Sequence, residues 1–322
     1  MSPPRGQPGR PRSGGGSGRS RRQPGGPGGR SGGFAGRKPP PPTRVTRRGR
    51  PDAVPAGRRG RASSASRARR GPGGDQIEGR QAVRELLLAG TRRVREVWMV
   101  HEGDKAPILD DIRELAQSRR VPLETVGKGR FAARARSEAP QGVLALAAPL
   151  PEADLDELAT GGRRTGDAGA KAPFLVALDG VTDPGNLGAI LRSAECAGVT
   201  GVVLPRHRAV HVTPAAAKAA AGAVEHLPMA VVGGIPSALA RLREAGVQVV
   251  GLDGEAPTSL YDLAGHEGPV CLVLGGEGRG LSRLTRQRCD QLVAVPLHGH
   301  LGSLNVSVAA ALACYEVARR RG

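Results

Sequence analysis

Aromatic residues are scarce in this chain: its 322 residues include three Phe, two Tyr and one Trp. The four cysteines, Cys196, Cys271, Cys289 and Cys314, lie far apart and form no C-x-x-C pair. We therefore expect neither a disulfide framework nor a metal site of the usual cysteine spacing. Reduced thiols inside apolar segments are the expected state, which favours a cytoplasmic protein.

Long apolar runs are also missing. No run reaches the ~18 apolar residues that a membrane-spanning helix needs. The first residues, Met1 to Arg5, continue into Pro and Gly and not into the apolar segment of a secretory signal. The sequence therefore predicts neither a membrane partner nor export.

Acidic residues are nearly absent from residues 1–75, which hold 19 Lys and Arg against Asp52 and Asp75. The same segment contains 19 Gly and 13 Pro, and its single aromatic residue is Phe34. It can bury too little apolar surface to offset its conformational entropy, so we predict a disordered tail. A Gly/Arg-rich tail attracts RNA phosphates without sequence preference, and an inert solubilising tail is the alternative.

The charges of the remaining 247 residues nearly balance, with 29 basic against 27 acidic groups. Residues 76–148 are predicted to form a small α/β domain, and residues 149–172, rich in Gly, Asp, Thr and Arg, a linker. In the small domain, strands are expected at 94–100, 121–126 and 142–147, and helices at 82–88 and 108–119.

Residues 173–322 alternate short apolar runs with helical patterns. Continuously apolar strands are typical of a parallel sheet that is covered on both faces, so the predicted fold is α/β and doubly wound. In such sheets ligands bind beyond the carboxyl ends of the strands. The expected strands are 174–178, 201–204, 247–252, 270–274 and 292–295, and the expected helices are 187–197, 214–224, 235–244, 281–289 and 304–320.

The first of three candidate motifs follows the strand at 174–178. Asp183-Pro184-Gly185 is a turn pattern, and Asn186 or a neighbour can cap the helix that carries Arg192. From spacing alone, a plain helix cap and a solvated helix arginine remain alternatives.

The second motif runs from Leu274 to Ser282 and places Glu277 among four glycines. It matches neither the G-x-G-x-x-G dinucleotide pattern nor a Walker loop, which needs Gly-Lys-Ser/Thr. A glycine-rich backbone still allows a flat ligand to approach closely. The alternative for Glu277 is a solvent-facing turn residue.

The third motif follows a buried-looking strand, residues 292–297, through a glycine-containing loop into an alanine-rich helix. The first helical turn is expected to hold Ser303, Asn305 and Ser307, where free backbone N–H groups suit a polar or anionic ligand. An ordinary connection with Ser303 as the helix cap is the alternative. His298 and His300 lack a third ligand at suitable spacing, so no metal is expected.

Taken together and in this order, the three motifs resemble the SpoU (TrmH) family of RNA ribose 2′-O-methyltransferases over residues 174–320. The resemblance rests on Asn186-x-Gly188-x-x-x-Arg192, on Leu274-Gly275-x-Glu277-x-x-Gly280, and on Val295-Pro296 through Ser303-Leu304-Asn305-Val306-Ser307. Gly79 to Val83 and Gln141 to Val143 also resemble the two ends of the L30e-like substrate-binding domain of one branch. That branch includes 23S rRNA guanosine 2′-O-methyltransferases.

The resemblance implies S-adenosylmethionine as the methyl donor, a deep trefoil knot in the C-terminal domain, and a homodimer. General fold rules argue against knots, so the knot rests on the resemblance alone. The implied cofactor-binding residues are Leu274, Gly275, Gly276, Glu277, Val295, Leu297, Ser303, Leu304 and Asn305.

Arg192 corresponds to the arginine that this family is thought to use for the ribose hydroxyl proton. Arginine is effectively always protonated, so a phosphate clamp is the more economical hypothesis. Asn186, Glu277, Ser303 and Asn305 would orient the ribose and Arg192. The implied substrate is RNA, with 23S rRNA favoured. A tRNA ribose, a thiostrepton-resistance-type rRNA site and a non-catalytic RNA-binding ribosome-assembly factor remain alternatives.

Overall fold

The computed structural model describes residues 71–101, 106–161, 172–207, 209–263 and 267–322, all within one compact unit. Most of the predicted tail lies outside the described residues. Its last part belongs with the folded chain, because Gly74 N donates to Val212 O at 2.9 Å and Val212 N donates to Pro72 O at 2.8 Å. Pro72 and Gly74, at the end of the predicted tail, are therefore hydrogen-bonded to the folded chain.

The first folded block is a four-stranded mixed sheet in the order β1-β4-β2-β3. Strand β4 runs antiparallel to β1 and β2, while β2 and β3 are parallel. Helices α1 and α2 cover one face, and α3 lies against the other with Phe131 beside Trp98. The elements are β1 (Gln76–Glu78), α1 (Arg80–Ala89), β2 (Val94–Val100), α2 (Pro107–Ser118), β3 (Leu123–Val126), α3 (Lys128–Arg134) and β4 (Val143–Ala147).

The second block is built on a seven-stranded sheet in the order β7-β6-β5-β10-β8-β11-β9. Every neighbouring pair is parallel, as the apolar runs predict. The strands are β5 (Phe174–Asp179), β6 (Gly201–Pro205), β7 (Met229–Val232), β8 (Gln248–Leu252), β9 (Thr258–Ser259), β10 (Val270–Gly275) and β11 (Gln291–Ala294).

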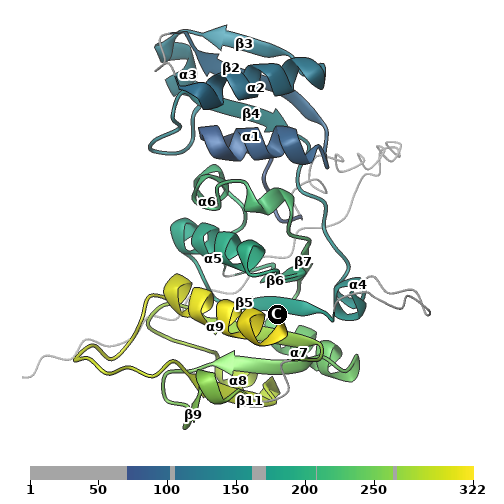
Figure 1. Ribbon diagram of the computed structural model, residues 1–322, viewed down its shortest axis with the longest axis vertical. Coiled ribbons are helices and arrows are strands. Elements are labelled where there is room, and N and C mark those ends of the chain that lie inside the picture. Colours follow the sequence, from purple (N-terminus) through teal and green to yellow (C-terminus); the bar gives the residue numbers. More distant parts are fainter. Residues whose placement is uncertain (1–70, 102–105, 162–171, 208, 264–266) are drawn as a thin grey trace, which may run out of the picture. The chain divides into compact units, whose positions relative to one another are not determined.

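Both faces of this sheet are covered, which confirms the parallel α/β prediction (Figure 1). Strand β5 shows why its run is continuously apolar: Phe174 and Val176 enter one core cluster, whereas Leu175 and Ala177 enter the other. Helices α5 (Pro184–Cys196) and α9 (Val306–Arg321) pack on the first face, and α4 (Leu155–Thr160), α7 (Ile235–Glu244) and α8 (Arg283–Arg288) on the second. Helix α6 (Pro214–Ala219) packs against α5 and against β1 of the first block.

The helix predicted over 214–224 is interrupted. Thr213 caps α6 by accepting from Ala216 N, and Pro214 occupies its first position. The α-helix ends at Ala219, and after Gly222 at φ 96° the chain continues as the 3₁₀ helix η2 (Ala223–Glu225). This break places Glu225 of η2 in contact with the first block.

Glu225 and Arg92 form a buried ion pair between the two blocks, with Nη2 and Oε1 2.6 Å apart. Both side chains are almost completely buried, at 3% and 0% exposed. Arg92 also donates to the carbonyl oxygen of Ala148 at 2.5 Å. Its guanidinium therefore bonds to Glu225 of the second block and to the backbone of the first.

The segment predicted to be a linker is partly helical. Leu155 and Leu158 of α4 are buried against the second face of the sheet, and Asp154 caps the helix at its start. Six residues are too few for a sustained period in the sequence, which explains why the helix was not predicted. Residues 162–171 of the predicted linker lie outside the described residues.

Candidate active site

The three predicted motifs follow β5, β10 and β11. These strands belong to one parallel sheet, and β10 pairs with β5 while β8 lies between β10 and β11. The carboxyl ends of parallel strands lie at one edge of the sheet, where ligands bind in open α/β folds. The segments after them are therefore brought together although they are distant in the sequence.

Side-chain hydrogen bonds join the motifs directly. The amide Nδ2 of Asn186 donates to Oε1 of Glu277, and Nδ2 of Asn305 donates to Oδ1 of Asn186 at 3.1 Å. The Oδ1 of Asn305 accepts from Ser307 N at 2.8 Å. We call Asn186, Glu277 and Asn305 the amide–carboxylate cluster. Because one residue comes from each motif, the cluster forms only when the sheet order is correct.

The residues that cap helices α5 and α9 are not Asn186 and Ser303, which were the caps in two of the sequence-based alternatives. Asp183 caps α5 by accepting from Asn186 N at 2.7 Å, so the side chain of Asn186 is not the cap. Asn305 caps α9, which begins at Val306. Ser303 precedes the helix and lies in the loop, so the prediction that it sits in the first helical turn is wrong.

A cavity of about 670 Å³ opens beside the cluster. All of the residues predicted to bind the cofactor line it, namely Leu274, Gly275, Gly276, Glu277, Val295, Leu297, Ser303, Leu304 and Asn305. The glycines allow a close approach of two backbones there: a Cβ at Gly276 would overlap the carbonyl oxygen of Gly180. The end of β10 can therefore lie directly against the end of β5.

The sequence analysis missed a second wall of this cavity. It consists of Leu252 at the end of β8, of Asp253, Gly254 and Glu255 directly after it, and of Arg286 of α8. Arg286 Nη1 lies 2.9 Å from Asp253 Oδ2, and Asp253 Oδ1 accepts from Glu255 N at 3.0 Å. The strand-end rule that selected the three motifs would also have selected Asp253, because it follows the apolar run of β8.

The lining suits the cofactor implied by the resemblance. Leu274, Val295 and Leu304 offer apolar contacts to a flat base, whereas Asp253 and Glu255 offer carboxylates to hydroxyls or to a positive charge. S-Adenosylmethionine combines an adenine, a ribose and a sulfonium cation, so its groups match the residues present.

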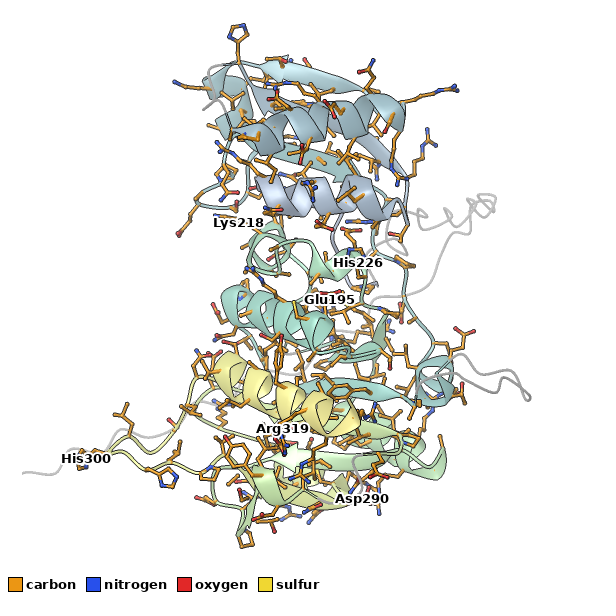
Figure 2. All side chains as sticks on the ribbon, viewed as in Figure 1. Glu195, Lys218, His226, Asp290, His300 and Arg319 are labelled. Atoms are coloured by element: carbon orange, nitrogen blue, oxygen red, sulfur yellow. The ribbon has the colours of Figure 1, made fainter. Side chains whose placement is uncertain are left out.

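The loop that carries Ser303 projects away from the domain. Strand β11 ends at Ala294, and Leu297, predicted as buried, is exposed. Leu301 is 81% exposed, and Figure 2 shows His300 at the tip of the loop. One wall of the site therefore has little contact with the rest of the chain.

Arg192 is the one predicted catalytic residue that the structure does not bring to the cluster. It lies six residues beyond Asn186, which places it about 9 Å farther along α5 and on another face of the helix. It lines a separate cavity of about 400 Å³ with Glu195, Cys196 and His226.

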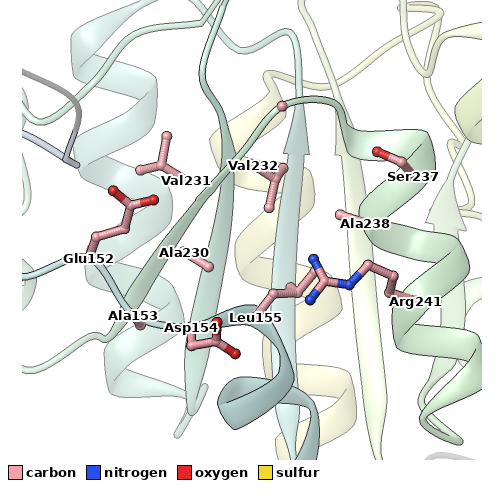
Figure 3. Close-up of a pocket in the computed structure, with 11 residues that line it drawn as sticks. Glu152, Ala153, Asp154, Leu155, Ala230, Val231, Val232, Ser237, Ala238 and Arg241 are labelled. Carbon is pink, nitrogen blue, oxygen red and sulfur yellow. The ribbon is translucent and has the colours of Figure 1, made fainter.

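Another cavity, of about 240 Å³, lies between α4, β7 and α7 (Figure 3). Its arginine, Arg241, forms an ion pair with Asp156 at 2.7 Å, and none of the predicted site residues lines it. Among the described residues, no group of three or more His, Cys, Asp or Glu could hold a metal ion. No helix in this part of the chain is long and apolar enough to cross a membrane.

These features define an α/β protein with a candidate ligand cavity beyond the carboxyl ends of its parallel strands. Residues 173–315 match the family described as "SpoU rRNA Methylase family", and residues 76–153 match "RNA 2'-O ribose methyltransferase substrate binding". The chain belongs to the SpoU rRNA methylase family.

Two relatives and one solved structure illustrate the similarity. The chain is 37% identical to a putative TrmH family tRNA/rRNA methyltransferase of Staphylococcus haemolyticus, over 76% of this chain and 95% of that protein. It is 40% identical to the 23S rRNA (guanosine-2'-O-)-methyltransferase RlmB of Pseudomonas syringae pv. tomato, over 77% and 96%. The SpoU methyltransferase AviRb of Streptomyces viridochromogenes, crystallised with AdoMet, superposes with a TM-score of 0.64 at 26% identity, covering 81% of this chain and 94% of that one.

Membership of the SpoU rRNA methylase family confirms the reaction class that the motifs predict. The chain is an RNA ribose 2′-O-methyltransferase that uses S-adenosylmethionine as its methyl donor.

Proposed function

We propose that this enzyme methylates the ribose 2′-OH of a guanosine in 23S rRNA. The observation that carries the proposal is the amide–carboxylate cluster beside the cavity, to which each of the three motifs contributes one hydrogen-bonded side chain. The choice of 23S rRNA is supported by the printed activity of the Pseudomonas syringae relative and by the substrate-binding match over residues 76–153.

The nine predicted cofactor-binding residues would hold S-adenosylmethionine, which supplies a methyl group activated by a sulfonium leaving group. Leu274, Val295 and Leu304 would pack on its adenine, and the closely approaching backbones at Gly275 and Gly276 would shape the cavity. The work of the protein in such a transfer is mainly orientation of the two reactants.

The cluster would orient the ribose. Glu277 accepts from Asn186, so the amide of Asn186 is held in one orientation, and its Oδ1 in turn accepts from Asn305. Ser303, two residues before Asn305 in the loop, adds a hydroxyl at the same wall of the cavity. Together these groups would hold the 2′-OH in line with the methyl group.

Arg192 would bind the phosphate next to the reacting ribose and stabilise the developing alkoxide. We propose that it does so in a homodimer, in which Arg192 of the partner subunit reaches the cluster. The support is the separation of Arg192 from the cluster within one chain and an exposed apolar row on α9, formed by Val308, Leu312 and Tyr315. These residues recur at helical spacing, so they share one face that a partner can cover.

Mixed dimers test this arrangement. Differently tagged Arg192→Ala and Asn305→Ala chains are co-expressed and compared with each variant alone. If one subunit supplies Arg192 and the other Asn305, half of the sites in each heterodimer are intact, and random pairing restores about a quarter of the wild-type activity. No recovery above the single variants would contradict the shared site.

Arg192→Lys tests the role of this residue as a clamp. It keeps the charge but loses the bidentate fork, so we expect methyl transfer to fall at least about tenfold while cofactor affinity is unchanged. Methylation at the wild-type rate would contradict the clamp.

We propose the domain division 76–148, 149–172 and 173–322, an L30e-like first domain, a trefoil knot in the second, and a cytoplasmic site of action. The cytoplasm is supported by the four cysteines, which are all free thiols. Burial raises the pKa of Cys314 to about 12, so this thiol stays protonated and unreactive.

Purified enzyme incubated with unmodified 23S rRNA and S-adenosylmethionine tests the reaction. Nucleosides from the digested RNA are separated by mass spectrometry, and 2′-O-methylguanosine is the expected product. Methylation of tRNA alone would overturn the proposed target. Tight RNA binding without cofactor affinity would favour a non-catalytic assembly factor.

A further inference from the structure

A cavity of about 700 Å³ in the first folded block is lined by four arginines and by no acidic residue. The arginines are Arg93, Arg95, Arg119 and Arg120, and the rest of the lining is Val94, Val121, Pro122 and Ala148. All four arginine residues are exposed to solvent. We refer to this feature as the arginine pocket.

No carboxylate of the described residues forms an ion pair with any of the four guanidinium groups. Arg119 Nη2 donates to Leu88 O at 2.7 Å and Arg95 Nη2 donates to Ala147 O at 3.1 Å, and both acceptors are uncharged carbonyls. Four positive charges therefore face one solvent-filled space.

Other arginines of the same block behave differently. Arg113 lies 2.5 Å from Asp110, and Arg84 lies 3.0 Å from Asp111. Arg92, directly beside Arg93 in the sequence, is buried against Glu225. The absence of carboxylates is thus a property of the pocket and not of the whole block.

Two residues beside the pocket have left-handed backbone conformations. Gly90 ends α1 at φ 57°, and the guanidinium of Arg119 lies next to it. Arg120 itself has φ 55°, in the left-handed region after α2, where glycine is the favoured residue. A charged side chain at such a position costs about 1 kcal/mol of backbone strain.

We propose that the arginine pocket binds phosphate groups of the substrate RNA. The proposal rests on the proposed function, because it takes RNA as the substrate of this same enzyme. Arginine is well suited to phosphate through bidentate, charge-assisted hydrogen bonds. The lining contains no aromatic ring on which a base could stack, so the pocket contacts the backbone and positions the RNA without reading its sequence.

Arg120→Gly in the full-length chain is the most informative variant. It removes a phosphate contact and also relieves the left-handed strain, so RNA binding and stability should change in opposite directions. We expect an unfolding temperature equal to or above that of the wild type. The plot of log binding constant against log salt for 23S rRNA should become shallower by about 0.7–0.9.

Arg93→Gln combined with Arg120→Gln extends the test to two contacts, with an expected reduction of the salt slope of about 1.4–1.8. The matched control is Arg113→Gln with Arg241→Gln, which removes the same charge from two exposed arginines that already face carboxylates. In methylation assays the pocket variant should raise KM for RNA several-fold and leave kcat and cofactor affinity unchanged.

A wild-type salt slope and KM in both pocket variants would overturn the proposal, as would equal effects in the control. If the variants lost RNA affinity only to the extent that they lost thermal stability, the proposal would also be overturned. A purely structural role of the arginines predicts that result. If the wild-type enzyme binds 23S rRNA but methylates another RNA, the proposed target fails while the salt slopes still decide the role of the pocket.

Discussion

At the scale of single residues, the proposed site rests on side chains that the fold brings together from three separate segments. Asn186, Glu277 and Asn305 were selected from separate motifs, and the structure joins them by hydrogen bonds. Their contacts could not be predicted, because they depend on the order of strands in the sheet. Asp253 follows an apolar run and could have been selected by the same rule, but its place in the same cavity depends on β8 lying between β10 and β11.

Asn305 makes two kinds of hydrogen bond that a substitution can separate. Its Oδ1 caps α9, and its Nδ2 donates to Asn186. Asn305→Ser keeps a capping oxygen but loses the amide donor, so we expect near-wild-type stability and methyl transfer reduced by up to about 10²-fold. Calorimetric unfolding and a methylation time course measure the two effects.

Asn305→Ala serves as the comparison for that variant. It loses the cap as well, and its free energy of unfolding should fall by a further ~1 kcal/mol. If Asn305→Ser were fully active, the donor bond to Asn186 would have no part in the reaction.

At the scale of elements, continuous apolar runs identified the inner strands of the parallel sheet. Strand β1 was missed because Gln76 and Glu78 are buried polar residues, and Glu78 is satisfied by backbone donors that no sequence pattern reveals. Helix α3 was missed because Phe131 is its single buried residue, which leaves no apolar period to detect. Both elements owe their formation to tertiary contacts.

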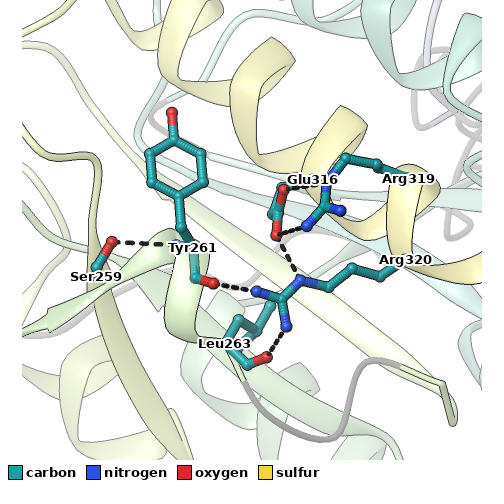
Figure 4. Close-up of polar contacts among 6 residues, drawn as sticks. All are labelled: Ser259, Tyr261, Leu263, Glu316, Arg319 and Arg320. Atoms are coloured by element: carbon teal, nitrogen blue, oxygen red, sulfur yellow. Dashed lines mark hydrogen bonds and ion pairs between the residues drawn. The ribbon is translucent and has the colours of Figure 1, made fainter.

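The end of α9 is held by an ion-paired group that the sequence pattern did not reveal (Figure 4). Glu316 accepts from Arg319 Nε at 3.0 Å and from Arg320, whose Nη1 donates to Leu263 O at 2.8 Å. Arg320 also donates to Tyr261 O, so the group ties the last turn of α9 to the segment around the 3₁₀ helix η3 (Leu260–Asp262). Hydrogen bonds from Arg319 and Arg320 lower the pKa of Glu316.

Glu316→Gln should therefore destabilise the protein in a pH-dependent way. Because the folded-state pKa is lowered, the stabilisation is present above the unfolded pKa of about 4.3 and is lost as pH falls through the folded value. We expect a loss of about 1–3 kcal/mol at neutral pH, which shrinks in acid. Urea unfolding across pH measures it, and the exposed Glu244→Gln is the control. A constant difference at every pH would contradict the assignment.

At the scale of the whole molecule, charge is concentrated in the segment before the folded blocks. Deletion of residues 1–70 removes 18 net positive charges without touching the hydrogen bonds of residues 72–74. We expect weaker RNA binding with a shallower salt dependence, each lost phosphate contact contributing roughly 0.7–0.9 to the slope. The control replaces these residues by a neutral Gly/Ser segment of equal length. An unchanged slope would support an inert tail.

The central claim is that this chain forms a 2′-O-methylguanosine in 23S rRNA, and mapping ribose methylation in a deletion strain tests it most directly. Total RNA is compared among the deletion strain, the strain complemented with the wild-type gene, and the strain complemented with Asn305→Ala. We expect that one guanosine of 23S rRNA loses its 2′-O-methyl group on deletion and regains it only with the wild-type gene. An identical methylation map of 23S rRNA in all three strains would contradict it.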